Sequence, residues 1–325
     1  MDEDIRGGLS QVFWHPDEQR LRAPFRLGAT LGLLLVVLTL IGAVSAVLGA
    51  ILDLGSTGGA VADPVVVVIL SIALLAITWF VDRRYLGDLG LALDRAWARD
   101  FVFGLLGGFL MAAVAVGTAV AAGVASVEGT LTTTDGSLFA GQSLPVGIAV
   151  SLAFFLLLAF FEELIFRGYI LVNVAEGLRG FGDADRAVTV AVAISAVLFG
   201  FAHAANPSAS ALSAVNITLF GLLLGGAYAL TDRLAIPVGL HAAWNFALGP
   251  VFGTPVSGLT SSVVLVDVTL TDSLLSGGDF GLEAGLLGLL GLFAGVVLVL
   301  GWLRVTTGTL SVREQVAEPY LWTSE

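Results

Sequence analysis

Eight long apolar runs divide this chain of 325 residues, and they constrain its fold more than any other feature. A run of about 18 or more apolar residues is typical of a helix that crosses a membrane. Charged residues make up only 12% of the sequence, whereas soluble domains average about 25%. We therefore expect an all-α, polytopic membrane bundle of about eight transmembrane helices. The runs lie near Phe25–Ile51, Val65–Val81, Phe101–Val127, Leu144–Asn173, Ala187–Ala205, Ala211–Thr231, Ala235–Val251 and Leu282–Leu303.

The polar segments between these runs predict four parts. These are a cytoplasmic segment (1–24), the first helices with an interfacial segment (25–143), a core that carries the buried polar residues (144–251), and an outer loop with the last helix and tail (252–325). Asp82–Asp100 alternates charged and apolar residues, which favours a position along the membrane interface. Glu128–Gly141 is predicted to be a polar loop. The alternating residues Val263–Val268 predict a short hairpin within the outer loop.

The distribution of arginine predicts the orientation of the chain. All 14 basic residues are Arg. With the amino terminus inside and eight spans, thirteen of them fall in inside segments and none in an outside segment. Arg167 is the remaining one, within an apolar run. Because Lys and Arg are enriched in cytoplasmic loops, we expect an integral plasma-membrane protein whose two termini are both cytoplasmic.

Cysteine content and net charge exclude some classes of function. The chain has no Cys, so it has no disulfide framework, no thiolate nucleophile and no thiolate metal ligand. Its net charge of −12 argues against a nucleic-acid partner. The lipid bilayer is the one partner that the composition requires.

The fourth apolar run carries three charged residues in its interior, Glu162, Glu163 and Arg167. A charge at membrane depth is costly unless it is paired or hydrated, so such residues are functional candidates by default. Glu163 and Arg167 are four residues apart, share a helix face and are predicted to form an ion pair. Glu162 points about 100° away and is left without this partner. A carboxylate in a partly dry site can act as a general base.

Two later runs carry the other strongly polar groups. His203 lies in one of them, and His241 with Asn245, four residues apart on one helix face, lies in the other. At about 1.5 Å of rise per residue, the four side chains can meet in the inner and middle part of the bilayer. One carboxylate, two imidazoles and an amide together fit hydrolysis. Taken singly, each group also has a structural reading: an ionic latch, an interhelical hydrogen bond or a polar clamp.

Three motifs in this order resemble the CPBP family, the CAAX prenyl endopeptidases and bacteriocin-processing proteins, also called the Abi family. They are Glu162-Glu163-x-x-x-Arg167, Phe199-x-x-x-His203 and His241-x-x-x-Asn245. The resemblance covers residues 144–251 and implies a catalytic core there, a bundle of about eight spans and peptide-bond hydrolysis within the membrane. It also implies a membrane-bound peptide or protein as substrate, prenylated or not. The implied catalytic residues are Glu162, His203, His241 and Asn245, with Glu163 and Arg167 beside them.

The resemblance leaves two mechanisms open. Members of the family are called metalloproteases, but a metal-free glutamate mechanism has also been argued. His203, His241 and Glu162 are a ligand set that can hold Zn²⁺ with water in a fourth position. Asn245 is an unusual zinc ligand and a natural oxyanion donor. We expect Glu162 to deprotonate a water held against His203, and His241 with Asn245 to stabilise the oxyanion, directly or through the metal.

Two functions of other classes compete with this interpretation. A proton-coupled transporter also needs buried Glu and His, but more often has inverted repeats and broken helices, and the sequence indicates neither. A non-catalytic scaffold or immunity protein would need no paired motifs facing one cavity. We therefore expect an intramembrane endopeptidase.

Overall fold

The structure is a computed structural model that describes residues 11–52 and 55–322, and helices dominate it. Within these residues, seven helical segments are long and apolar enough to cross a membrane, which confirms the expected polytopic bundle. The helices are α2 (Ala23–Leu52), α3 (Gly55–Ile77), α4 (Arg95–Ala121), α5 (Leu144–Glu163), α6 (Val172–Leu178), α7 (Ala184–Ala202), α8 (Ala211–Thr231), α9 (Ala235–Phe246) and α10 (Leu286–Thr307). The first ten residues of the predicted segment 1–24 lie outside the described residues.

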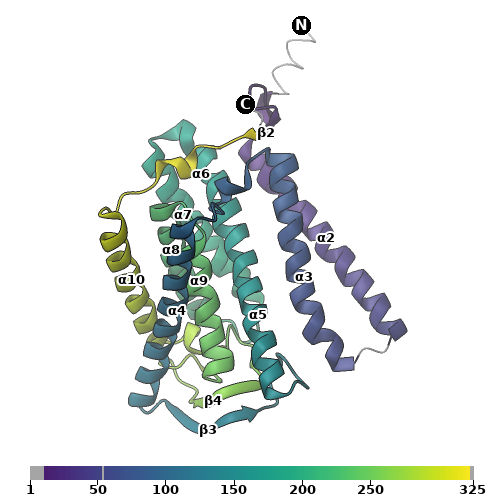
Figure 1. Cartoon of the computed structure of the whole chain (residues 1–325), viewed down its shortest axis with the longest axis vertical. Helices are drawn as coiled ribbons and strands as arrows, with labels where there is room; N and C mark the ends of the chain where they lie inside the picture. Colours follow the sequence, from purple (N-terminus) through teal and green to yellow (C-terminus); the bar gives the residue numbers. More distant parts are fainter. Residues whose placement is uncertain (1–10, 53–54, 323–325) are drawn as a thin grey trace.

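The run predicted as the seventh span, Ala235–Val251, is not among these seven segments, because its helix is shorter than theirs. It comprises α9 and the π-helix η6 (Ala247–Val251). Nearly every residue of α9 is buried, and the helix packs against α4, α5 and α8. Because protein rather than lipid surrounds it, its length does not have to match the thickness of the bilayer. Figure 1 shows α9 in the middle of the bundle, with α2 and α3 standing as a pair to one side.

Glycine allows α4 and α9 to approach closely. A Cβ atom added to Gly239 would lie 2.6 Å from the Phe101 carbonyl oxygen and 2.9 Å from the Cα atom of Gly104. Small residues at such contacts let two membrane helices pack backbone against backbone. The contact fixes the height and rotation of α9, the helix that carries His241 and Asn245.

Several predicted helix boundaries differ from the structure. The run Phe101–Val127 is helical from Arg95, where Asp94 caps α4 through the Trp97 backbone N–H, and this helix ends at Ala121. The run that begins at Leu282 becomes α10 only at Leu286, after a short 3₁₀ turn. The fourth run continues beyond Asn173 to Leu178, through the π-helix η3 (Leu164–Leu171) and α6. Apolar character predicts membrane depth, whereas capping residues and glycine decide where a helix begins and ends.

Two strands pair outside the helices, and their pairing differs from the predicted hairpin. β3 (Ala125–Thr133) pairs antiparallel with β4 (Val263–Leu270), so Val263–Val268 pairs with a distant segment rather than within its own loop. Part of the predicted polar loop Glu128–Gly141 is therefore a strand. The register is broken by a bulge between Val127 and Gly129. The two strands lie across the lower end of the bundle in Figure 1.

The opposite end of the bundle is held by a buried ionic network. Arg26 and Arg84 are fully buried and contact both Asp82, at the end of η1 (Thr78–Asp82), and Glu176 of α6. Arg20 also belongs to this network, because its Nη2 atom lies 3.0 Å from Glu176 Oε1. Arg20 is part of the short strand β2 (Arg20–Leu21), which pairs with β1 (Trp14–His15). The predicted interfacial segment Asp82–Asp100 runs along this end through the 3₁₀ turn η2 (Leu86–Leu89).

Candidate active site

The three charged residues of the fourth run lie where α5 changes into a π-helix. Glu163 is the last residue of α5, and η3 begins at Leu164. π-helical turns are rare and are often found at functional sites. Arg167 Nη1 donates to Glu163 Oε1 at 2.7 Å, and both side chains are fully buried. The predicted ion pair therefore forms, and Arg167 also donates to the Gly221 carbonyl of α8 at 3.2 Å.

His241 lies between the two glutamates. Its Nδ1 is 2.9 Å from Glu163 Oε1, and its Nε2 is 3.7 Å from Glu162 Oε2. Because the carboxylate of Glu163 accepts, Nδ1 carries the donated proton and Nε2 faces Glu162. The rings of Phe199 and Phe220 each meet the imidazole edge to face, with ring centroids 5.7 Å apart. The imidazole is thus fixed by one carboxylate and two aromatic rings.

Glu162 differs from its neighbour in its surroundings. Its side chain is 19% exposed, whereas that of Glu163 is fully buried. The Oε2 atom of each glutamate has no hydrogen-bond partner among the described residues. Oε1 of Glu163, however, accepts from both Arg167 and His241, and neither of these bonds reaches Glu162. Because Glu162 lines the cavity and is partly exposed, its carboxylate is available to bind water. Glu162 has the environment expected of a base, and Glu163 that of a structural anchor.

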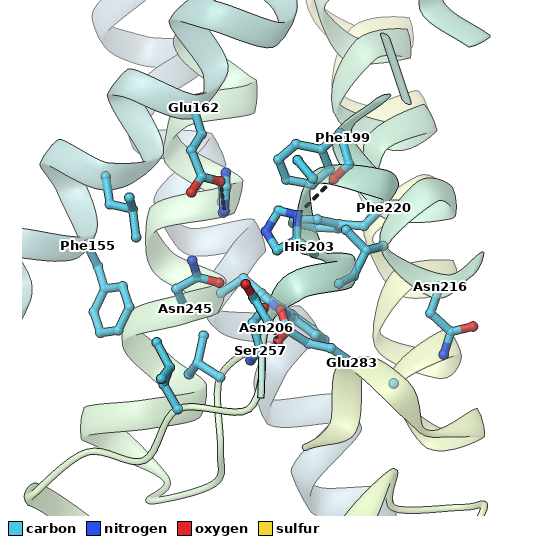
Figure 2. Close-up of a pocket in the computed structure, with 18 of the residues that line it drawn as sticks. Phe155, Glu162, Phe199, His203, Asn206, Asn216, Phe220, Asn245, Ser257 and Glu283 are labelled. Carbon is cyan, nitrogen blue, oxygen red and sulfur yellow. Dashed lines mark hydrogen bonds and ion pairs between the residues drawn. The ribbon is translucent and has the colours of Figure 1, made fainter. Parts of the chain in front are cut away.

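His203 and Asn245 complete the polar face of the site. His203 follows α7 directly, and its Nδ1 donates to the Phe199 carbonyl at 2.8 Å. The other ring nitrogen, Nε2, takes no part in this hydrogen bond. Asn245 lies one turn beyond His241 on α9 and is only 6% exposed. Figure 2 shows Glu162 and Asn245 facing His203 across a cavity. The structure therefore brings all four predicted catalytic side chains to one place.

The cavity has a volume of about 460 Å³ and is lined mainly by apolar side chains. Aromatic residues form much of its wall, and a polar group of side chains lies farther from Glu162. The aromatic residues include Phe155, Phe161, Phe166, Phe199 and Phe220, and the polar group includes Asn206, Ser257 and Glu283. An apolar wall with a few convergent polar groups is typical of a small-molecule or peptide site.

Sequence analysis did not single out Asn206, Ser257 or Glu283. Glu283 Oε2 accepts hydrogen bonds from the Ser257 backbone at 2.5 Å and hydroxyl at 2.9 Å, and Oε1 accepts one from Trp244 Nε1 at 3.1 Å. It therefore ties a loop to α9 beside Asn245. A carboxylate at the edge of an apolar run was a signal that could have found Glu283. Ser257 and Asn206 lie in loops, and the sequence spacing of a loop residue does not predict which helices it will contact.

The predicted zinc ligands line one cavity but do not lie close enough together to hold a metal ion in this structure. Within the described residues, no group of three His, Asp or Glu side chains lies close enough together to hold a metal ion. Glu162 and His241 are neighbours. The Nδ1 atoms of His241 and His203 donate to Glu163 and to the Phe199 carbonyl, as the second nitrogen of a metal-ligating His usually does, so these bonds leave both Nε2 atoms free. The residues do not fit a three-ligand zinc centre in this arrangement, and zinc binding stays a prediction.

Comparison with known proteins agrees with the motifs. Residues 144–247 match the family model described as type II CAAX prenyl endopeptidase Rce1-like. The matched segment holds all six residues singled out from the sequence, and it runs from the start of α5 to just past the end of α9. Neither the curated proteins nor the solved structures gave a match to this chain. The resemblance drawn from the three motifs is thereby confirmed.

Proposed function

Residues 144–247 belong to the CAAX prenyl endopeptidase family, and from this premise we propose that the chain is an intramembrane endopeptidase. Its substrate is a peptide segment of a membrane-associated protein. One observation carries the proposal: Glu162, His203 and Asn245, from three different helical segments, line a single cavity within the bundle. A scaffold needs no such convergence, and none of these groups is used up in holding helices together.

Glu162 is the general base. A water molecule between its carboxylate and the free nitrogen of His203 loses a proton to Glu162 while its oxygen bonds to the substrate carbonyl carbon. The carbonyl electron pair moves onto the carbonyl oxygen, which becomes an oxyanion. The amide N–H of Asn245 donates to this oxyanion. His241 stabilises it as the imidazolium, with Nδ1–H donated to Glu163 and Nε2–H donated to the oxyanion.

Glu162 then acts as the acid. The oxyanion reforms the carbonyl, the carbon–nitrogen bond breaks, and the proton held by Glu162 passes to the departing amine. Glu163 and Arg167 are positioning residues: Glu163 fixes the ring of His241, and Arg167 holds Glu163 against α8. No step requires a metal.

The test compares the termini of membrane proteins in cells that carry the wild-type chain or a variant. Glu162→Gln keeps the size of the side chain and removes the base, so the cleavage products should disappear while the protein stays folded. Glu283→Gln alters the other carboxylate of the same cavity. It should keep cleavage per folded molecule, because Glu283 is not the base. Its amide replaces an acceptor of Ser257 or Trp244, so a lower thermal stability is expected for this variant. Unchanged products with Glu162→Gln would reject Glu162 as the base.

The same assay decides the question of the metal. Zinc content and cleavage are measured on the purified protein before and after treatment with a strong chelator. We expect cleavage to survive chelation, because the described residues hold no three-ligand group. Loss of activity that zinc restores would instead favour His203, His241 and Glu162 as ligands.

A further inference from the structure

The cavity of the proposed active site reaches one end of the bundle. Besides helix residues, its wall contains residues from four loops at that end: Leu138 after β3, Asn206 after α7, Ser257 and Leu259 before β4, and Glu283 before α10. These loops lie beside the β3–β4 pair, at the lower end of the bundle in Figure 1. Ser257, Leu259 and His203 are partly exposed. The site is therefore continuous with this end.

The other end is closed above the site. Between the Glu163–Arg167 pair and that end, a cluster of fully buried apolar side chains fills the bundle, among them Leu164, Tyr169, Leu171 and Leu234. Beyond this cluster lies the buried network of Arg26, Arg84, Asp82 and Glu176. No residue of the network lines the cavity. A peptide can thus reach Glu162 from the β3–β4 end and not through the packed end.

The arginines mark the closed end. Apart from Arg167, every Arg of the described residues lies in a segment at the closed end, and no Arg lines the cavity. They are Arg20, Arg22, Arg26, Arg83, Arg84, Arg95, Arg99, Arg179, Arg186, Arg233, Arg304 and Arg313. Arginine is enriched on the cytoplasmic side of membrane proteins and sets their orientation. The closed end is accordingly the cytoplasmic one.

We infer that the active site opens to the extracytoplasmic side of the membrane. It receives a chain whose scissile bond lies at the outer flank of a membrane anchor. That this chain is a substrate rests on the proposed endopeptidase function. The apolar wall suits the segment of such a chain that is leaving the bilayer, and the polar loop residues at the mouth suit the hydrated backbone beyond it. The site thus lies on the side of the ion pair that faces the β3–β4 end, whereas depth along the helices had predicted the inner and middle part of the bilayer.

Single cysteines test the access route without any cleavage assay, because the chain has no Cys of its own. Leu259→Cys places a thiol in the wall of the cavity. Ser137→Cys marks the exposed outer loop after β3, and Gln315→Cys marks the exposed tail at the arginine-rich end. Intact cells that carry each variant are treated with a membrane-impermeant maleimide, and labelling is compared with that in permeabilised cells.

We expect Leu259→Cys and Ser137→Cys to be labelled in intact cells, and Gln315→Cys only after permeabilisation. Labelling of Gln315→Cys in intact cells, with Leu259→Cys protected until permeabilisation, would place the mouth in the cytoplasm and overturn the inference. Protection of Leu259→Cys under both conditions would overturn it as well, since the cavity would then be closed at this end.

A second readout connects access with substrate. Peptide termini that depend on Glu162 should map to the extracytoplasmic flanks of membrane proteins, and a majority on cytoplasmic flanks would contradict the inference. If no termini depend on Glu162, the proposed endopeptidase function fails. The labelling pattern still decides on which side the cavity opens.

Discussion

Two adjacent glutamates acquire different roles because their side chains point about 100° apart on the same helix. Glu163 directs its carboxylate to Arg167 and His241, and Glu162 directs its own to the cavity. Arg167 also lies over the ring of Phe199, 4.4 Å from its centroid. The pair is fully buried, so each charge depends on the other for compensation.

Removing one member of this pair should destabilise the fold. Glu163→Ala leaves the Arg167 guanidinium buried without its ion-pair partner, and Arg167→Ala leaves the Glu163 carboxylate buried without its own. Each substitution should lower the free energy of unfolding by about 3–5 kcal/mol. Thermal unfolding in detergent measures the loss. Glu162→Ala is the control, with a much smaller effect expected, since its carboxylate is partly exposed and forms no hydrogen bond with the described residues. Equal stability of all three variants would contradict the division of roles.

Asp232, just beyond α8 at the arginine-rich end, should make stability depend on pH. Burial and the nearby carboxylate of Asp88 raise the pKa of Asp232 to about 7, against the opposing effect of Arg233 and Arg313. A raised carboxyl pKa favours the protonated form in the folded state. Its stabilising effect is therefore complete below the ordinary pKa near 3.8 and is lost as pH rises through about 7.

We expect unfolding temperatures to fall between pH 5 and pH 8, by the equivalent of about 1–2 kcal/mol once solvent screening is allowed for. Asp232→Asn should remove this part of the dependence, and Asn suits the left-handed backbone at this position, where φ is 57°. Asp183→Asn, at an exposed carboxyl, serves as the control. A pH profile that Asp232→Asn leaves unchanged would rule out Asp232 as its source.

The site residues could be predicted from sequence because burial of a charge in an apolar run is rare and informative. Glu162, Glu163, Arg167, His203, His241 and Asn245 all lie at or beside the cavity. Their individual partners could not be predicted. The contact of His241 with Glu163 depends on the rotation of α9 relative to α5, and no spacing within either helix sets this rotation.

At the scale of elements, long helices were predictable and the strands were not. The hydrophobic runs are long enough to identify the membrane helices, even though caps moved their ends by several residues. β3 and β4 are separated by more than a hundred residues, and alternation within one segment does not reveal its partner. Only the closure of the bundle brings the ends of α4 and η6 together so that the two strands meet.

The close contact of α4 with α9 should be sensitive to a single methyl group. Gly239→Ala would place Cβ 2.6 Å from a backbone oxygen of α4, so the helices must separate and α9 must shift. We expect lower thermal stability, by about 1–3 kcal/mol, and weaker cleavage because His241 and Asn245 move with the helix. Gly226→Ala on α8 is the matched control, since its added methyl group meets no atom within 4 Å. Equal behaviour of the two variants would show that the contact is loose.

For the whole molecule, the two ends of the bundle have different tasks. The end with β3 and β4 carries the loops around the cavity, whereas the other end joins distant parts of the chain. The tail after α10 crosses that end, as the yellow trace in Figure 1 shows. It is attached through the Arg313 backbone N–H to the Ala229 carbonyl at 2.8 Å, and through Trp322, which stacks on Trp79 with ring centroids 5.9 Å apart.

This division predicts that the tail supports stability without taking part in the chemistry. Trp322→Ala removes the stacking on Trp79 and the hydrogen bond from Trp322 Nε1 to the Trp79 carbonyl at 3.0 Å. The free energy of unfolding should fall by about 1–3 kcal/mol. Cleavage per folded molecule should stay unchanged below the unfolding temperature, because the packed cluster and the ionic network separate the tail from Glu162. Leu310→Ala, at an exposed position of the same tail, is the control. A loss of cleavage by Trp322→Ala at full folding would mean that the closed end is coupled to the site, and the packed cluster would then transmit motion rather than only seal the bundle.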